Sequence, residues 1–229
     1  MSTLASESRL KDGRRRYNTG TPDLLLDAAE YLFSRMDYES TTLADIANQA
    51  DANVGQIVYH FGTKEELLRA CILRRAVTLS EQRRKLLENY QQLVGKQGMQ
   101  IEPLIRAYMD PFFELVLGDD DRGRNYARLL ARFVWRENAT EIIAEGFNEA
   151  AKLYIESFRE ALPGLDEDSV ARGFQFMLGA IYSSVTGDKR IELLTDGASK
   201  ARDYQAYYNV LVPFVAAGFT RMAENNASA

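Results

Sequence analysis

The sequence predicts an all-α fold, and three observations lead to that class. Apolar residues recur at i, i+3, i+4 and i+7 along most of the 229-residue chain. No stretch alternates apolar and polar side chains in the way a half-buried strand does. Helix-capping residues stand directly before several of the apolar patterns. We therefore expect about nine helices, three short ones at the N-terminus and a larger bundle after them.

Composition and charge describe a folded chain but do not name a partner. Hydrophobic residues make up 46% of the chain, which fits one large or two small cores. The net charge is −5, and residues 1–75 hold 10 Lys and Arg against 11 Asp and Glu, so bulk charge does not indicate nucleic acid. Cys71 is the single cysteine and is expected to be an inert buried thiol. Together with the single histidine, His60, it argues against a structural zinc site, so we expect no metal or cofactor.

Residues 1–20 are polar and include a run of arginines, Arg14, Arg15 and Arg16. They lack the apolar core of a secretory signal, so we expect a cytoplasmic protein. The run predicts either a solubilising tail or a basic arm that contacts DNA ahead of a helical DNA-binding unit.

The stretch 41–68 combines two short helical patterns with several capped helix starts. Apolar residues repeat at helical spacing over 43–50 and again over 54–61. Helices this short do not persist alone, because nucleation costs more than a few turns return. Two such helices joined by a tight turn are typical of a helix-turn-helix, which presents its second helix to the DNA major groove. We therefore expect a DNA-binding domain over 21–68.

Local signals place the helix boundaries within this domain. Pro22 opens a first helix that is expected to run to about Asp37. Thr42 and Thr63 begin capping boxes, and Asn53 caps the helix between them. The turn before Asn53 contains Asp51, where we expect a left-handed backbone that glycine adopts more easily.

Residues 69–229 are expected to form the helical bundle. Its expected helices cover 64–94, 102–117, 121–136, 140–162, 166–186 and 203–223, with a kink or break at Pro111. The stretches 173–187 and 204–220 carry no charge, yet they are too short for a membrane span, so no membrane partner is expected.

These two uncharged helices also predict a homodimer interface. A helix that is apolar on nearly all faces is buried on all faces, which favours a subunit interface over a core within one chain. The residues expected at the interface are Phe174, Ile181, Tyr208, Leu211, Phe214, Val215 and Phe219.

Two features of the bundle are candidates for an effector site. Arginines recur every four residues along one helix, at Arg124, Arg128, Arg132 and Arg136. The next helix carries an acidic stripe formed by Glu137, Glu141, Glu145 and Glu149. The stripes predict either an interhelical ladder of salt bridges or a site where Arg132 and Arg136, beside Trp135, bind an acidic head-group.

The second feature is a supply of aromatic and methionine side chains. Its members are Tyr108, Met109, Phe112, Phe113, Phe133, Phe147, Phe176, Met177 and Tyr182. They predict an apolar cavity for a small molecule, with ordinary core packing as the alternative.

The segment TTLADIANQADANVGQIVYHFGTKEELL resembles the helix-turn-helix signature of the TetR family of transcriptional regulators. The preceding LLLDAAEYLFSRMDYESTT resembles that family's first helix, and the specific likeness covers about residues 21–70. The resemblance implies a homodimer that places its third helix in the major groove. It also implies a C-terminal domain that binds a small effector and dimerises through its last two long helices.

Carried onto this sequence, the resemblance implies roles for individual residues. Thr42 would touch a phosphate, and Tyr59, His60 and Lys64 would grip the DNA backbone. Asn53, Val54 and Gln56 would face the groove, where Gln56 can pair with adenine and Val54 can meet a thymine methyl. Val58 stands where many members carry an aromatic residue, so we expect it in the core.

The leading hypothesis is therefore a repressor of transcription that binds double-stranded operator DNA and is switched by a small molecule. A helical protein-binding adaptor and an activator without a small-molecule effector are the alternatives. An enzyme is disfavoured, because the sequence has no glycine-rich phosphate loop, nucleophile elbow or second histidine.

Overall fold

The computed structural model describes residues 22–137 and 139–227, and within them every regular element is a helix, which confirms the all-α class. The arginines of the N-terminal arm, Arg14, Arg15 and Arg16, lie outside the described residues. The elements are α1 (Pro22–Phe33), α2 (Leu43–Gln49), α3 (Val54–Phe61), α4 (Lys64–Val94), the 3-10 helix η1 (Lys96–Gly98), α5 (Ile101–Leu117), α6 (Asp121–Phe133), α7 (Ala139–Ala161), α8 (Glu167–Val185), α9 (Arg190–Leu194) and α10 (Tyr204–Ala227).

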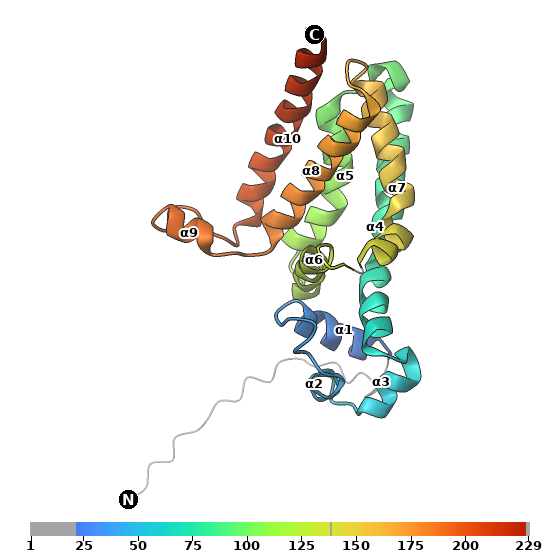
Figure 1. Ribbon diagram of the computed structural model, residues 1–229, viewed down its shortest axis with the longest axis vertical. Coiled ribbons are helices and arrows are strands. Elements are labelled where there is room, and N and C mark those ends of the chain that lie inside the picture. Colours follow the sequence, from blue (N-terminus) through green and yellow to red (C-terminus); the bar gives the residue numbers. More distant parts are fainter. Residues whose placement is uncertain (1–21, 138, 228–229) are drawn as a thin grey trace, which may run out of the picture.

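The molecule is elongated, with α1, α2 and α3 at one end and the bundle at the other (Figure 1). Helix α4 runs through both parts, so its N-terminal turns pack against α1 and α3 and its remainder packs against α5 and α7. Helix α6 lies between the two parts and contacts α1, α4, α5 and α8. A displacement of α4 or α6 would therefore change contacts in both parts of the molecule.

The small N-terminal unit is held by local capping and a compact core. Thr42, Asn53 and Thr63 each accept a hydrogen bond from the backbone N–H three residues on, as the capping patterns predict. Asp51 adopts φ +52°, which confirms the left-handed turn between α2 and α3. Gly62, at φ +75°, ends α3 and turns the chain into α4.

Several features differ from the prediction. Helix α6 ends at Phe133, three residues before the expected end, and α10 runs four residues further than expected, to Ala227. Helix α1 ends at Phe33 because Ser34 Oγ donates to the Tyr31 carbonyl (2.8 Å), an acceptor that a longer helix would use. Helix α5 runs through Pro111 without a break. Helix α9 was not predicted, and it projects from the body between α8 and α10 (Figure 1). None of the described helices has the length and apolar character that crossing a membrane requires.

Candidate DNA interface and junction cavity

Helix α3 has one buried side and one exposed apolar side. Ile57 is fully buried against the neighbouring helices, whereas Tyr59 is 85% exposed and Val54 and Val58 are also exposed. The expectation that Val58 serves the core is wrong, because Ile57 already fills the inward position of this two-turn helix. His60 is exposed beside Tyr59, with the two ring centroids 5.0 Å apart. Exposed apolar and aromatic side chains on a short capped helix are what a groove-reading element requires.

The polar residues of α3 are partly engaged in capping. The Gln56 N–H donates to Asn53 Oδ1, and the Asn53 N–H donates to Gln56 Oε1, both at 3.0 Å. The Gln56 oxygen therefore already has a donor, and pairing both amide atoms with an adenine would require this cap to open. Thr42 Oγ1 is likewise engaged, because it accepts from the Asp45 N–H (3.1 Å) and donates to its carboxylate. Their contacts with DNA stay predictions.

Lys64 is held inside the protein. Its ammonium donates to the carbonyls of Tyr38 (2.7 Å) and Thr41 (2.9 Å) and lies 4.2 Å from the centroid of the Tyr38 ring. These contacts tie the first turn of α4 to the connection between α1 and α2. The predicted phosphate contact of Lys64 is untested, and the geometry favours a role in positioning this connection next to Thr42.

The predicted ladder between the arginine and glutamate stripes is absent from the described residues. Arg124 pairs with Asp121, Arg128 donates to the Tyr204 hydroxyl (2.7 Å), Arg132 pairs with Asp37 (2.5 Å) and Arg136 pairs with Glu39 (2.9 Å). The reason is that α7 packs along α4, where one of its glutamates, Glu145, pairs with Arg69. Arg132 and Arg136 instead reach the connection between α1 and α2.

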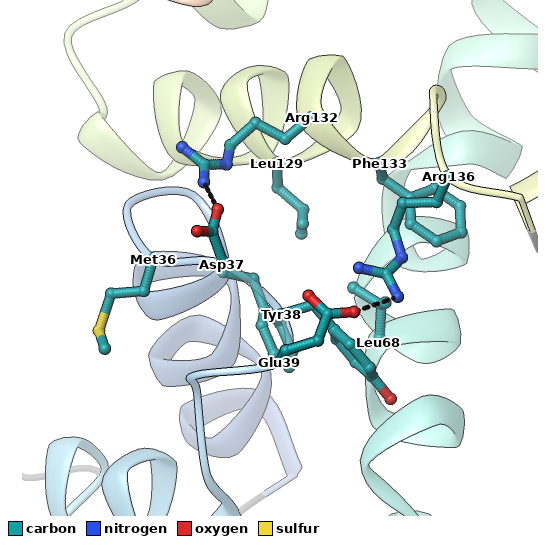
Figure 2. Close-up of a pocket in the computed structure, with 10 residues that line it drawn as sticks. Met36, Asp37, Tyr38, Glu39, Leu68, Leu129, Arg132, Phe133 and Arg136 are labelled. Carbon is teal, nitrogen blue, oxygen red and sulfur yellow. Dashed lines mark hydrogen bonds and ion pairs between the residues drawn. The ribbon is translucent and has the colours of Figure 1, made fainter.

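A cavity of about 80 Å³ lies at this junction, which we call the junction cavity (Figure 2). Its lining residues are Phe33, Met36, Asp37, Tyr38, Glu39, Leu68, Leu129, Arg132, Phe133 and Arg136. The Arg136 guanidinium carbon lies 4.4 Å from the centroid of the Tyr38 ring. Arg136 Nε is buried and has no hydrogen-bond acceptor among the described residues. Two of the arginines that the sequence singled out therefore line one cavity, between the two parts of the molecule.

Comparison with known proteins supplies the family. One family profile, described as "Bacterial regulatory proteins, tetR family", matches residues 25–71. A second, described as "Tetracyclin repressor-like, C-terminal domain", matches residues 106–218. The chain belongs to the TetR family. It is a DNA-binding transcriptional regulator with an N-terminal helix-turn-helix domain and a C-terminal helical domain.

Solved structures share the fold of this TetR-family regulator at low sequence identity. FadR from Bacillus subtilis, solved with stearoyl-CoA, is 20% identical with a TM-score of 0.58, over 86% of this chain and 99% of that chain. SmeT, the repressor of the Stenotrophomonas maltophilia multidrug efflux pump SmeDEF, is 16% identical with a TM-score of 0.58, over 86% and 89%. PfmR from Thermus thermophilus is 22% identical with a TM-score of 0.50, over 82% and 97%. No curated protein matches the chain in sequence.

Most of the aromatic and methionine side chains expected to line a cavity pack in the core of this TetR-family regulator. Those that are buried are Tyr108, Met109, Phe112, Phe113, Phe133, Phe147, Met177 and Tyr182, whereas Phe176 is 72% exposed. The Tyr108 ring meets Tyr154 and Phe174 edge-on at 5.0 and 5.1 Å, and Phe112 meets Tyr182 at 6.2 Å. Burial raises the pKa of the Tyr108 hydroxyl. These contacts favour the core-packing alternative, and ligand binding by these residues stays a prediction. Trp135, 67% exposed, is not among the residues that line the junction cavity.

The residues expected at the dimer interface are mostly inside the subunit. Those that are buried within the chain are Phe174, Ile181, Leu211, Val215 and Phe219. Tyr208 is half-buried, and its hydroxyl donates to Asp110 Oδ1 (2.5 Å). These side chains are covered because α8 and α10 pack against each other and α10 also packs against α5, so their place in a dimer interface stays a prediction.

Phe214 alone of the expected interface residues is well exposed. Phe176 on α8 and Val210 on α10 are also exposed; the sequence analysis assigned Phe176 to the apolar cavity and did not single out Val210. Phe176 lies two residues after the buried Phe174, so the two side chains are on different sides of α8. The sequence alone does not say which of those sides faces solvent.

Proposed function

We propose that the chain is a cytoplasmic homodimeric repressor that binds double-stranded operator DNA through α3 and is released by a small apolar or acidic effector. The observation that carries the proposal is the exposed face of α3, where Tyr59 and Val58 stand in solvent on a helix whose opposite side is locked by Ile57. An exposed apolar and aromatic helix face of this kind can contact base edges when the helix enters the major groove.

The DNA contacts follow from the residues on and around that face. Val54, Tyr59 and His60 are exposed; Val54 would meet a thymine methyl, and Tyr59 and His60 would contact the DNA backbone. The N-terminal third of the chain is near neutral, so bulk charge cannot supply the affinity for DNA. That affinity would come from individual side-chain contacts, from the arginines of the N-terminal arm and from the two DNA-binding domains of a symmetric dimer.

Dimerisation is supported by exposed apolar side chains on adjacent helices of the bundle. Phe176, Val210 and Phe214 are each exposed by 67% or more, and α8 and α10 pack side by side. Large apolar side chains exposed on packed helices are typical of an interaction site, and a two-fold interface uses the same surface on both subunits. Such a dimer would present two recognition helices to two half-sites.

Release by an effector is supported by the position of α6 and by the relatives. FadR was solved with stearoyl-CoA and SmeT with triclosan, and each of those ligands is a small molecule with a large apolar part. An effector that binds better to one dimer geometry would shift the population away from the geometry that matches the operator.

The deciding experiment is an electrophoretic mobility shift with DNA selected from a random pool and with the DNA upstream of the gene. We expect a specific, salt-dependent complex that Tyr59→Ala weakens strongly. Leu93→Ala is the matched control, because Leu93 is equally exposed but lies near the far end of α4. A protein-binding adaptor, which the exposed apolar surface also fits, would form no such complex, and an activator would bind DNA but raise transcription in a reporter assay.

A further inference from the structure

We propose that the junction cavity is a binding site for a small carboxylate, and that its occupancy frees the connection between α1 and α2 from Arg132 and Arg136. The inference rests on the proposed function, because it names one ligand class and one site for the switch. The site is formed where the DNA-binding unit, α4 and α6 meet (Figure 2).

The charged side of the junction cavity is built for a carboxylate. Arg132 lies on the last turn of α6 and Arg136 three residues beyond its end, and both side chains reach toward the connection that follows α1 (Figure 2). A guanidinium presents a planar fork of N–H donors that matches the two oxygens of a carboxylate. Arg136 Nε is buried without an acceptor, so one donor of that fork is unused among the described residues. A ligand oxygen in the cavity would satisfy it.

The other side of the junction cavity selects for a compact apolar body. Phe33, Leu68 and Leu129 are buried beneath the arginines. A volume of about 80 Å³ is several times the space that one ordered water needs, yet it is far below the size of a drug-sized pocket. The cavity therefore suits a short aliphatic or aromatic acid.

The present partners of the two arginines are easily replaced. The side chains of Asp37 and Glu39 are 80% and 72% exposed, so each can return to water when its arginine is taken by a ligand. Ion pairs between exposed groups stabilise proteins weakly. A carboxylate that also buries an apolar body gains contacts that Asp37 and Glu39 do not make.

The same connection positions the DNA-binding unit. It leads directly into Thr42, which caps α2, and it is held from the other side by Lys64 at the start of α4. Loss of the contacts from Arg132 and Arg136 would leave the connection attached to α4 through Lys64 and to α6 only through Arg35, whose Nη1 donates to Asn125 Oδ1 (2.8 Å). The ligand thus makes different contacts in the two states, which is the requirement for a shift between them.

The test uses the full-length protein without DNA and calorimetric titration with butanoate, hexanoate and benzoate at constant ionic strength. Benzamide, which has the size of benzoate but no charge, is the ligand control. We expect saturable binding of at least one carboxylate, and we expect Arg136→Gln to weaken it by about tenfold or more. Arg172→Gln is the matched protein control, because Arg172 is an exposed arginine paired with Asp168 on α8.

A second variant changes the affinity in the opposite direction. Asp37→Asn combined with Glu39→Gln removes the internal competitors and should tighten carboxylate binding, which a damaged protein cannot mimic. The proposal is overturned if none of the three carboxylates binds saturably, or if Arg136→Gln leaves their affinity unchanged.

The switch is then measured separately, as the DNA affinity with and without the bound carboxylate. We expect it to fall when the carboxylate is bound, and an unchanged DNA affinity would overturn the switch while leaving the site. Failure to bind any DNA while Arg136-dependent carboxylate binding persists would instead overturn the proposed repressor.

Discussion

At the scale of single residues, Glu30 links the pH of the solution to stability. Its carboxylate is buried between α1 and α4, with Oε1 3.0 Å from Arg74 Nη2 and Oε2 4.0 Å from Arg75 Nε. Burial raises the pKa of Glu30 to about 7, against the opposing effect of the two arginines, and the nearby Asp27 adds to the rise. Between pH 4.5 and about 7, Glu30 is therefore protonated in the folded protein, although its carboxyl is ionised in the unfolded chain because the pH is above its ordinary pKa.

We expect stability to decline as the pH rises from about 4.5 to above 7, because the raised carboxyl favours folding only while it is protonated. The loss from this group is on the order of 3 kcal/mol at pH 8. Glu30→Gln should reduce the difference in unfolding free energy between pH 5 and pH 8, measured by urea unfolding. Glu81→Gln, at an exposed position on α4, should keep the wild-type difference. If Glu30→Gln leaves this pH dependence of the unfolding free energy unchanged, the Glu30 carboxylate is ionised in the folded state.

Lys64 provides a second prediction, which separates positioning from phosphate contact. Lys64→Met removes two hydrogen bonds to carbonyls, so we expect a loss of about 2 kcal/mol in unfolding free energy together with weaker DNA binding. If Lys64 only positions the α1–α2 connection, the slope of log K against log salt stays at the wild-type value. A slope reduced by about 1 would instead identify a phosphate contact. Lys85→Met, at an exposed lysine of α4, is the control.

At the scale of elements, the turn between α2 and α3 carries a strained residue. Asp51 holds φ +52°, where an L-residue is disfavoured and glycine is not. We expect Asp51→Gly to stabilise the protein by about 0.5–1 kcal/mol in thermal unfolding, with DNA affinity retained. Ala44→Gly, at the exposed second residue of α2, should instead destabilise the protein. Destabilisation by Asp51→Gly would mean that the Asp51 side chain itself supports the turn.

The elements also show which features a sequence can predict. Helical periodicity and caps act over a few residues, so the helix-turn-helix, its three caps and the full extent of α4 were predicted correctly. The partners of Arg132 and Arg136 lie 95 and 97 residues away in the chain, so spacing along one helix gave no access to them. Helices α8 and α10 have long uncharged stretches, so no polar stripe marked which side faces solvent. Packing against α5 within the same subunit made that choice.

At the scale of the whole molecule, the proposed dimer surface on α8 and α10 would bring two recognition helices together. A charge at the centre of a buried apolar interface costs about 2 kcal/mol or more, so Phe214→Glu should convert the dimer to monomer in sedimentation velocity at micromolar concentration. DNA affinity should fall with it, because each half-site would then be bound alone. Leu93→Glu places the same charge at an equally exposed position outside α8 and α10 and should stay dimeric. A Phe214→Glu protein that remains dimeric would move the interface elsewhere, and α9, which projects from the body with Leu193 and Leu194 exposed, would be the next surface to substitute (Figure 1).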